Sequence, residues 1–510
     1  LRIPTRSSYI ILMFFLIMYA FLVEGRPSIL RATIMTLIFL LGKLIWKETN
    51  LLNTISVSAF ALLCINPFSL FDAGFQLTYL ATLSIVIFYP KFIKYLPKLP
   101  LRISEILALS TASQLGVIPI MAKTFNRVTF SSLILIFAAL PLVASIMIGG
   151  YIFLFFSFLS PVLANWIVQV INFLINLLLS ISHLFDRFSF LSYRIPTPHT
   201  ATIIGYFLFL LLLVLLWDKK KLKWMALAGF LVFFAVLIIY PFPSTSKDLK
   251  VTFIDVGQGD SILVEFPGQK KMLIDGGGVF SDSFDIGERI LSPFLWNKGI
   301  KTIDYLVLTH PHPDHLNGLI SAARNFKVRE FWESLSPIED KSYEELLRNL
   351  SASTVHQRMF RGDSRQINGT VIHILHPKDG GLQSSQVDNE LSMVLRLSYG
   401  QISFLFTGDI GQASEQNILE NISPIKSDIL KSPHHGSLSS SSEEFLSAVN
   451  PSVIVIQVGE NNRYNFPNPI ILQRYIEQGA TLYRTDSHGA IEISSDGQIY
   501  KIRTALNPLH

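Results

Sequence analysis

Long apolar runs dominate the first 240 residues of the chain. They lie at residues 9–23, 29–46, 51–66, 74–90, 103–122, 129–160, 162–182, 201–217 and 224–240. Several approach the ~20 residues that a membrane-spanning helix needs, so residues 1–240 predict a polytopic α-helical membrane domain. The runs at 29–46 and 51–66 are marginal and also fit interfacial or re-entrant segments.

The run at 129–160 is longer than a single span requires. It contains Pro141 and the pair Gly149–Gly150, which favour a break in a helix. This run therefore predicts either one broken helix or two short ones, and the number of spans is open by two.

The pattern changes after a Pro/Ser linker at residues 241–248. "KVTFIDV" and "SILVEF" alternate apolar and polar residues on either side of the turn "GQGD", as strands do. Helix-like stretches such as "SYEELLRNL" separate the later apolar strands. Residues 249–510 therefore predict one domain in which strands and helices are mixed.

Charge divides the chain at the same place. Residues 1–248 carry 19 Lys and Arg against 7 Asp and Glu, whereas residues 249–510 carry 23 against 30. The basic loops at 90–102 and 218–223 are expected to face the cytoplasm. These two placements agree if the run at 129–160 crosses the membrane once, and they conflict if it crosses twice. With residues 218–223 inside, the span at 224–240 places the second domain outside the cytoplasm.

Two further features limit the interpretation. Cys64 is the one cysteine, which excludes an intrachain disulfide and a thiolate-rich metal site. The chain begins with Leu1 and has no signal-peptide pattern, so we expect that further sequence precedes it in the natural protein.

Four potential metal ligands stand within six positions at the end of an apolar strand. They are His310, His312, Asp314 and His315, in "LVLTHPHPDHLNGL". With this His-x-His-x-Asp-His spacing, one loop offers two ligands to each of two adjacent metal ions. The nitrogen and oxygen ligand set suits Zn²⁺, with Mn²⁺ as the second choice.

A dinuclear site needs ligands from other strand ends as well. Asp409 ends "FLFTGD" and is suited to bridge two metals, while His434 and His435 stand together in "LKSPHHGS". Two divalent ions on the order of 4 Å apart can activate a water and hold the oxygens of a phosphodiester. Asp314 and Asp409 are accordingly the expected catalytic carboxylates. Asp275 in "LIDGGG" either orients a ligand or serves as a plain turn residue.

The order of these motifs resembles one known family. "FIDVGQGDSILVEF", "LIDGGG", "LVLTHPHPDHLNGL", "FLFTGD" and "LKSPHHGSLSSSSEEFL" are similar to the C-terminal domain of ComEC-type competence proteins. In the apolar half, "GRPSILRATIM" and "NPFSLFDAGFQLTYLATLSIV" are similar to the membrane domain of that family. Those proteins are bacterial inner-membrane channels for DNA uptake.

The resemblance implies a polytopic membrane (competence) domain followed by a metallo-β-lactamase-like αββα sandwich. It implies a metal-dependent nuclease that degrades the DNA strand that is not transported. The implied partners are DNA, the plasma membrane, other competence proteins and a second copy of the chain.

The resemblance also assigns residues by position. It implies metal ligation by the following side chains, with His435 preferred over His434: His310, His312, Asp314, His315, Asp409 and His435. Asp255 and Asp260 in "DVGQGD" would shape the floor of the site. Asn389 stands where many members of the superfamily have another histidine, so the first metal would be weakly held.

A second departure concerns catalysis. Phe466 and Asn468 in "YNFPNP" occupy positions where the family commonly has histidines. If one of those histidines transfers a proton, this copy would be slow or inactive.

Polar side chains also recur inside the apolar half. Spacings of three and four place one set on a single helix face: Asn165, Gln169, Asn172, Asn176, Ser180 and His183. This stripe either lines a wet path for a polymer or bonds helices together. Asp72 and Gln76 share another face, either as functional groups or as partners of a neighbouring helix.

Three functions are consistent with the sequence. The first is a DNA-uptake channel with a nuclease domain, and the second is a DNA transporter with an inactive module. The third is a membrane-tethered metallohydrolase without a transport role. The acidic balance of residues 249–510 does not resemble a nonspecific DNA binder, although bound metals would offset part of it.

Overall fold

The computed structural model describes residues 5–24, 26–45, 50–186, 188, 192–239, 246–278, 284–334, 340–378, 389–421 and 425–507. The chain divides into two compact units, Leu1–Tyr240 and Pro241–His510. We call the first the membrane unit and the second the sandwich unit. Residues 241–245 of the expected linker lie outside the described residues.

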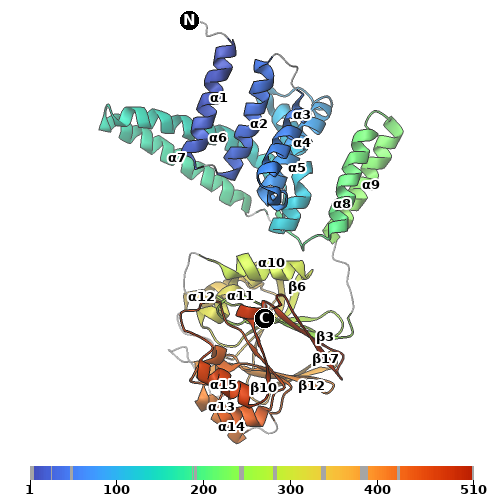
Figure 1. Ribbon diagram of the computed structural model, residues 1–510, viewed down its shortest axis with the longest axis vertical. Helices are drawn as coiled ribbons and strands as arrows, with labels where there is room; N and C mark the ends of the chain where they lie inside the picture. Colours follow the sequence, from blue (N-terminus) through green and yellow to red (C-terminus); the bar gives the residue numbers. More distant parts are fainter. Residues whose placement is uncertain are drawn as a thin grey trace. The chain divides into compact units, whose positions relative to one another are not determined.

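The helices of the membrane unit follow the apolar runs of the sequence (Figure 1). They are α1 (Thr5–Leu22), α2 (Pro27–Leu44), α3 (Leu51–Ile65), α4 (Ala73–Phe92), α5 (Ile103–Phe125), α6 (Ser132–Ser157), α7 (Pro161–Asp186), α8 (Thr200–Leu215) and α9 (Lys220–Ile239). Within the described part of the chain, six are long and apolar enough to cross a membrane: α1, α2, α4, α5, α6 and α7. α3 and α8 are shorter apolar helices.

The run at 129–160 forms one unbroken helix, so the expected break is wrong: the structure has neither a broken helix nor two short ones. α6 continues through Pro141 and the glycine pair without interruption. Pro141 removes one backbone hydrogen bond, but an apolar surrounding favours keeping all the others inside the helix. α6 and α7 run side by side as a hairpin, which lies across the direction of α1 and α2 in Figure 1.

The two sequence motifs of the membrane unit pack against each other. Arg31 on α2 is 7% exposed, and its Nη2 lies 2.9 Å from Oδ1 of Asp72. Asp72 also accepts a hydrogen bond from the Phe75 backbone N–H and so caps α4. A side chain on Gly74 would begin 2.9 Å from the Arg31 guanidinium, so the glycine makes room for the arginine. Asp72 thus has the neighbouring-helix partner that one interpretation expected.

The sandwich unit contains two sheets in the described residues. The first has the order β17-β16-β3-β4-β5-β6-β7-β8, with β3 (Leu249–Phe253), β4 (Ile262–Glu265), β5 (Lys271–Ile274), β6 (Thr302–Leu308), β7 (Lys327–Glu333), β8 (Val355–Arg358), β16 (Ile491–Ser495) and β17 (Tyr500–Thr504). The second has the order β15-β14-β13-β12-β11-β10-β9, with β9 (Ser364–Ile367), β10 (Thr370–His376), β11 (Val394–Tyr399), β12 (Ile402–Phe406), β13 (Ile429–Lys431), β14 (Val453–Ile456) and β15 (Thr481–Arg484).

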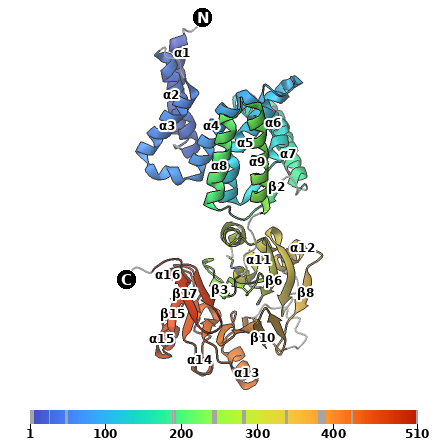
Figure 2. The same ribbon diagram turned by 90° about the vertical axis from the view of Figure 1, so that its right-hand side faces the viewer.

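Helices cover the outer face of each sheet (Figures 1 and 2). One layer contains α10 (Ser292–Asn297), α11 (Pro313–Asn325) and α12 (Lys341–Asn349). The other contains α13 (Gln412–Asn421), α14 (Glu443–Val449) and α15 (Pro469–Glu477). The expected αββα sandwich is therefore confirmed.

Alternation along the strands produces this layering. Phe404 and Phe406 of β12 point into the core between the sheets, where Phe406 contacts Phe253 of β3. Leu405, between them, points the other way and packs with the residues under α13–α15. Both faces of the central strands are buried, so these strands read as continuous apolar runs.

We predict that Arg31 and Asp72 stabilise the membrane unit as a pair. Arg31→Leu and Asp72→Asn should each lower the unfolding temperature, and the double variant should lose less than the sum of the two. The coupling energy should be about 0.5–3 kcal/mol, because either single change leaves one partner unpaired. Thermal unfolding of the full chain in detergent measures it.

The exposed pair Arg102 and Glu105, with side chains 84% and 50% exposed, is the matched control. Its coupling should be close to zero because water screens it. Strictly additive losses for Arg31→Leu and Asp72→Asn would contradict the prediction.

Candidate metal centre

The predicted ligands come from the carboxyl ends of parallel strands in both sheets. Asp275 follows β5, and the loop that begins at His310 follows its parallel neighbour β6. Asp409 follows β12, and His435 follows the parallel β13. The ends of parallel strands meet at one edge of a sheet, so residues far apart in the sequence converge there.

Local geometry then fixes the loop that carries four of the ligands. His312 is the N-cap of α11, Pro313 opens the helix, and Asp314 and His315 lie in its first turn. A Cβ on Gly278 would lie 1.8 Å from the Pro313 carbonyl oxygen. Because Gly278 has no side chain, the segment that follows β5 can contact the start of α11 directly.

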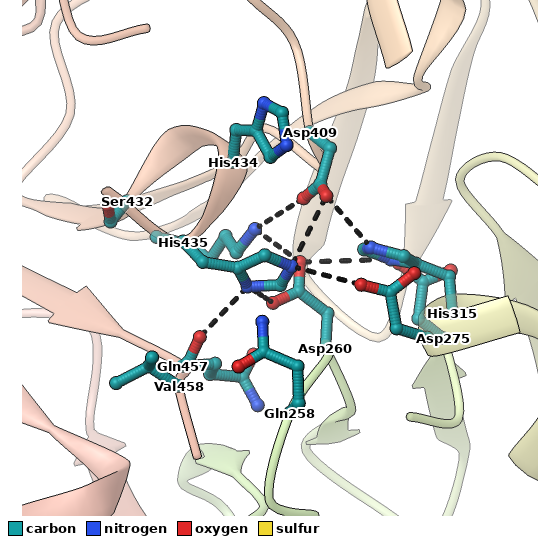
Figure 3. Close-up of polar contacts among 12 residues, drawn as sticks. Gln258, Asp260, Asp275, His315, Asp409, Ser432, His434, His435, Gln457 and Val458 are labelled. Atoms are coloured by element: carbon teal, nitrogen blue, oxygen red, sulfur yellow. Dashed lines mark hydrogen bonds and ion pairs between the residues drawn. The ribbon is translucent and has the colours of Figure 1, made fainter. Parts of the chain in front are cut away.

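Four buried side chains form a compact group. They are Asp314, His315, Asp409 and His435, whose potential ligand atoms all lie within 4.8 Å of one another. Oδ2 of Asp409 is 3.2 Å from Nε2 of His315 and 3.2 Å from Nε2 of His435. Figure 3 shows the Asp409 carboxylate between the two imidazoles.

The outer nitrogens of both imidazoles are already engaged. Nδ1 of His315 lies 2.8 Å from a carboxylate oxygen of Asp275, and Nδ1 of His435 lies 2.9 Å from the Gln457 carbonyl. Both partners accept hydrogen bonds, so each Nδ1 carries a proton and each Nε2 faces the group, where it can bind a metal ion once it has lost its own proton. Within the described residues these buried Nε2 atoms make no hydrogen bond. Such a donor set fits a divalent metal ion.

The charges within this group couple metal binding to the release of protons. Burial disfavours charge on His315, but Asp409 and Asp275 outweigh it and hold the pKa of His315 well above its usual range. Burial likewise opposes charge on Asp409, but His435, His315 and Lys431 hold the pKa of Asp409 well below its usual range. A metal that takes the two Nε2 lone pairs would displace protons, so its affinity rises with pH.

Lys431 is a member of this centre that the sequence did not identify. Its side chain is fully buried, forms an ion pair with Asp260, and lies 3.4 Å from Oδ1 of Asp409. Its ammonium also donates to the Gly408 carbonyl at 2.8 Å. The available signal was a lysine in the apolar strand "DILKS", two residues before the proline that precedes the histidine pair.

The other predicted ligands lie beside the compact group. The His310 ring is 4.1 Å from that of His315 and 4.8 Å from that of His312. His310 is buried, with no hydrogen bond at Nε2 among the described residues. His434 is partly exposed, and its Nε2 is 3.3 Å from Nδ2 of Asn389.

The residues expected to support the ligands divide into two classes. Asp275 and Asp260 approach His315 Nδ1 at 2.8 Å and 3.9 Å, and Asp275 also accepts bonds from Thr309. Asp255 instead accepts a bond from the Gly257 N–H in its own turn. The structure therefore brings Asp260 and Asp275 to the group and places Asp255 in the adjoining turn.

The backbone at the histidine pair is strained. His434 and His435 have φ of 46° and 54°, in the left-handed region that residues other than glycine rarely adopt. Each such residue costs on the order of 1–3 kcal/mol and persists only where its surroundings enforce it. With this backbone conformation the His435 side chain points into the group, while His434 stays partly exposed.

The candidate channel residues lie in the membrane unit. Asn165, Gln169, Asn172 and Asn176 lie along α7, and most of this face is exposed or partly exposed. Gln76 on α4 donates to the Leu70 carbonyl at 2.9 Å. None of the four α7 amides is buried by the described residues of this chain.

Comparisons with known proteins match both units. Residues 1–220 match the "Competence protein" family, and residues 254–459 match the "Metallo-beta-lactamase superfamily". ComE operon protein 3 of Bacillus subtilis is 29% identical over 96% of this chain and 64% of its own length. Recombination protein 2 of Haemophilus influenzae is 25% identical over 76% of this chain and 50% of its own length. The chain therefore spans less than two thirds of the length of either relative.

Among solved structures, the metallo-β-lactamase fold protein YhfI from Bacillus subtilis is similar to the sandwich unit. It is 13% identical, covers 48% of this chain and 99% of its own, and has a TM-score of 0.33. The fold assignment rests on the family match and on the two helix-covered sheets.

We predict a graded loss of metal binding. His435→Gln removes a predicted nitrogen ligand and should abolish high-affinity binding of zinc to the full chain. Asp275→Asn replaces the carboxylate that orients His315 with a neutral amide, which has one acceptor oxygen in place of two, and should weaken binding roughly 10–100-fold. Zinc titration after chelator treatment, with elemental analysis, measures both.

The exposed His373 of β10 provides the control. His373→Gln should bind zinc like the unaltered chain. Equal zinc affinity in His435→Gln and His373→Gln would contradict the assignment.

We also predict that Lys431 stabilises the centre when metal is removed. Lys431→Met leaves Asp260 and Asp409 buried without their ammonium partner, which should cost about 3–5 kcal/mol of unfolding free energy. Denaturation of the full chain in chelator measures the change. Lys426→Met, at an exposed lysine just before the same strand, should have little effect. Equal stability of the two variants would contradict the prediction.

Proposed function

Because the chain joins a competence-protein domain to a metallo-β-lactamase-superfamily domain, we propose that it is a bacterial DNA-uptake protein with a metal-dependent nuclease domain. Competence-family membership implies DNA handling and membrane association, and the superfamily domain suggests a metal-dependent hydrolase. The finer proposal is that the sandwich unit hydrolyses phosphodiester bonds of incoming DNA. The observation that carries it is the buried Asp314–His315–Asp409–His435 group.

The residues of the centre would bind two metal ions. Asp314, His315, Asp409 and His435 would hold one divalent ion, and His310, His312 and His434 would serve a second. Zn²⁺ fits this set best and Mn²⁺ is the second choice. When bound, such ions polarise a phosphate ester and activate water.

The remaining residues would keep this arrangement fixed. Asp275 and the Gln457 carbonyl hold the outer nitrogens of His315 and His435, so the two imidazoles keep their orientation. Lys431 holds one oxygen of Asp409 and leaves the other facing the histidines. Catalysis would depend on Asp409, whose carboxylate meets both histidines, and on Asp314, whose carboxylate approaches His435.

The proposed membrane sidedness is supported by charge and by the α6–α7 hairpin. The basic loops at 90–102 and 218–223 are proposed to face the cytoplasm. With α5 and α8 each crossing the membrane once, a hairpin that crosses twice or not at all leaves both loops on the same side. α9 would then lead outward, and the sandwich unit would meet DNA outside the plasma membrane.

The amide face of α7 is the proposed contribution of the membrane unit to the DNA path. Asn165, Gln169, Asn172 and Asn176 lie unburied along one side of an otherwise apolar helix. Polar groups in a membrane helix are costly unless water or a polar partner meets them. The rival role is bonding to another helix, to a second copy of the chain or to another competence protein. Asp72 and Gln76 contribute less to this proposal because each already has a partner within the unit.

One observation favours a second candidate function, a DNA-binding module without catalysis. Asn468, where relatives of the resembled family have histidine, accepts a hydrogen bond from the Ile470 N–H and caps α15. An asparagine amide does not titrate near neutral pH, so it cannot replace a histidine in proton transfer, and here it has a structural role instead.

The nuclease proposal is tested on the full chain in detergent, supplied with Mn²⁺ or Zn²⁺ and end-labelled linear DNA. We expect metal-dependent cleavage that falls at least ~100-fold in Asp409→Asn, because that variant loses the carboxylate between the histidines. His373→Gln is the matched control and should cleave normally. A metal-loaded chain that binds DNA and leaves it intact would refute the nuclease and support the inactive module.

A further inference from the structure

A column of aromatic rings leads from the surface of the sandwich unit to the metal centre. The rings of Tyr464 and Phe466 stack with centroids 5.5 Å apart and planes 19° apart. Phe466 in turn stacks on His435 at 6.4 Å and 28°. We call Tyr464 and Phe466 the aromatic column, since neither belongs to the ligand group.

The segment that carries the column is held rigidly by its own polar side chain. Oδ1 of Asn462 accepts a hydrogen bond from the Phe466 N–H, and Nδ2 of Asn462 donates to the Phe466 carbonyl at 2.7 Å. Asn461 and Asn465 adopt left-handed backbone, which asparagine tolerates better than most residues. The two rings are therefore positioned before any ligand arrives.

The same segment is tied to the ligand loop. The Asn468 N–H donates to the carbonyl of Gly436, the residue that follows His435. A side chain on Gly436 would begin 2.7 Å from Cβ of Pro467, so the two loops are in close contact. A group bound on the aromatic column would thus have a fixed distance to the metal centre.

The outer end of the column combines an exposed ring with a cation. Tyr464 is 40% exposed, and the Arg463 guanidinium lies over its ring, 4.8 Å from the centroid, and donates to the Tyr464 hydroxyl at 2.5 Å. Arg463 is not buried and places positive charge on a domain whose overall balance is negative. Exposed aromatic rings beside arginine are the usual platform for unpaired nucleobases, whose flat faces stack on them.

We propose that the aromatic column is a nucleobase-stacking subsite, in which an unpaired base displaces the Arg463 guanidinium from the Tyr464 ring and stacks there, while Arg463 meets the adjoining phosphate. This rests on the proposed nuclease function, because the backbone of the same strand would enter the metal centre beyond Phe466. Stacking tolerates every base and requires that the base be unpaired. The chain should therefore engage single strands and frayed ends in preference to closed duplex.

The test uses the full chain in detergent with the Asp409→Asn substitution, so that bound DNA is not cut. The probe is a short oligothymidylate with one central 2-aminopurine, whose fluorescence is quenched on stacking. We expect quenching on binding, and Tyr464→Leu should abolish the quenching and weaken binding roughly 10-fold. Tyr464→Phe should retain both, because it keeps the ring.

Two controls isolate the stacking contact. Ile476→Ala removes another exposed apolar side chain, from α15, and should change neither readout. An oligonucleotide of equal length that is abasic at every position should bind equally well whether or not the Tyr464→Leu substitution is present, because it keeps its phosphates and has no base to stack.

The outcomes separate this inference from the nuclease proposal. Two results would overturn the stacking subsite even if the chain cleaves DNA. One is binding without quenching of the 2-aminopurine probe. The other is equal affinity for that probe in chains with Tyr464 and with Tyr464→Leu. Quenching that depends on Tyr464 supports the subsite even if the chain with Asp409 restored fails to cleave.

Discussion

Carboxylates withdrawn from water require counter-charges, and this constraint organises the sandwich unit. Asp260, Asp275 and Asp409 are almost fully buried, and Asp314 nearly so. Each would be destabilising alone, since an unpaired buried charge costs several kcal/mol. Imidazoles from two strand ends and the ammonium of Lys431 supply the compensation. The parallel strands, the glycine-lined approach to α11 and the strained histidine pair all serve to bring these groups together.

The sequence predicted the fold and most of the centre because its signals are local. The spacing of His310 to His315 after an apolar strand, and Asp409 at another strand end, required no knowledge of distant contacts. Lys431 was missed because a single lysine in a short strand does not reveal which way its side chain points. Asp255 and Asp260 share one motif, yet only Asp260 reaches the group, since the intervening glycine turn decides their directions.

The contacts that spacing could not predict join segments far apart in the chain. Arg31 and Asp72 are 41 residues apart, so the sequence left Asp72 open between a functional group and a partner. The stacking of Phe466 on His435 depends on how two loops meet. The sequence showed only that Phe466 stands where the resembled family has histidine. Its stacking on His435 was visible only in the structure.

The buried ammonium of Lys431 also bears on how the protein is made. Many small metal sites assemble only when the ion arrives, so that folding waits on metal supply. Here a covalently attached cation already neutralises part of the acidic interior. A sandwich unit built in this way does not need a metal ion to neutralise all of its acidic interior, so folding and the proposed loading with metal would be separate events.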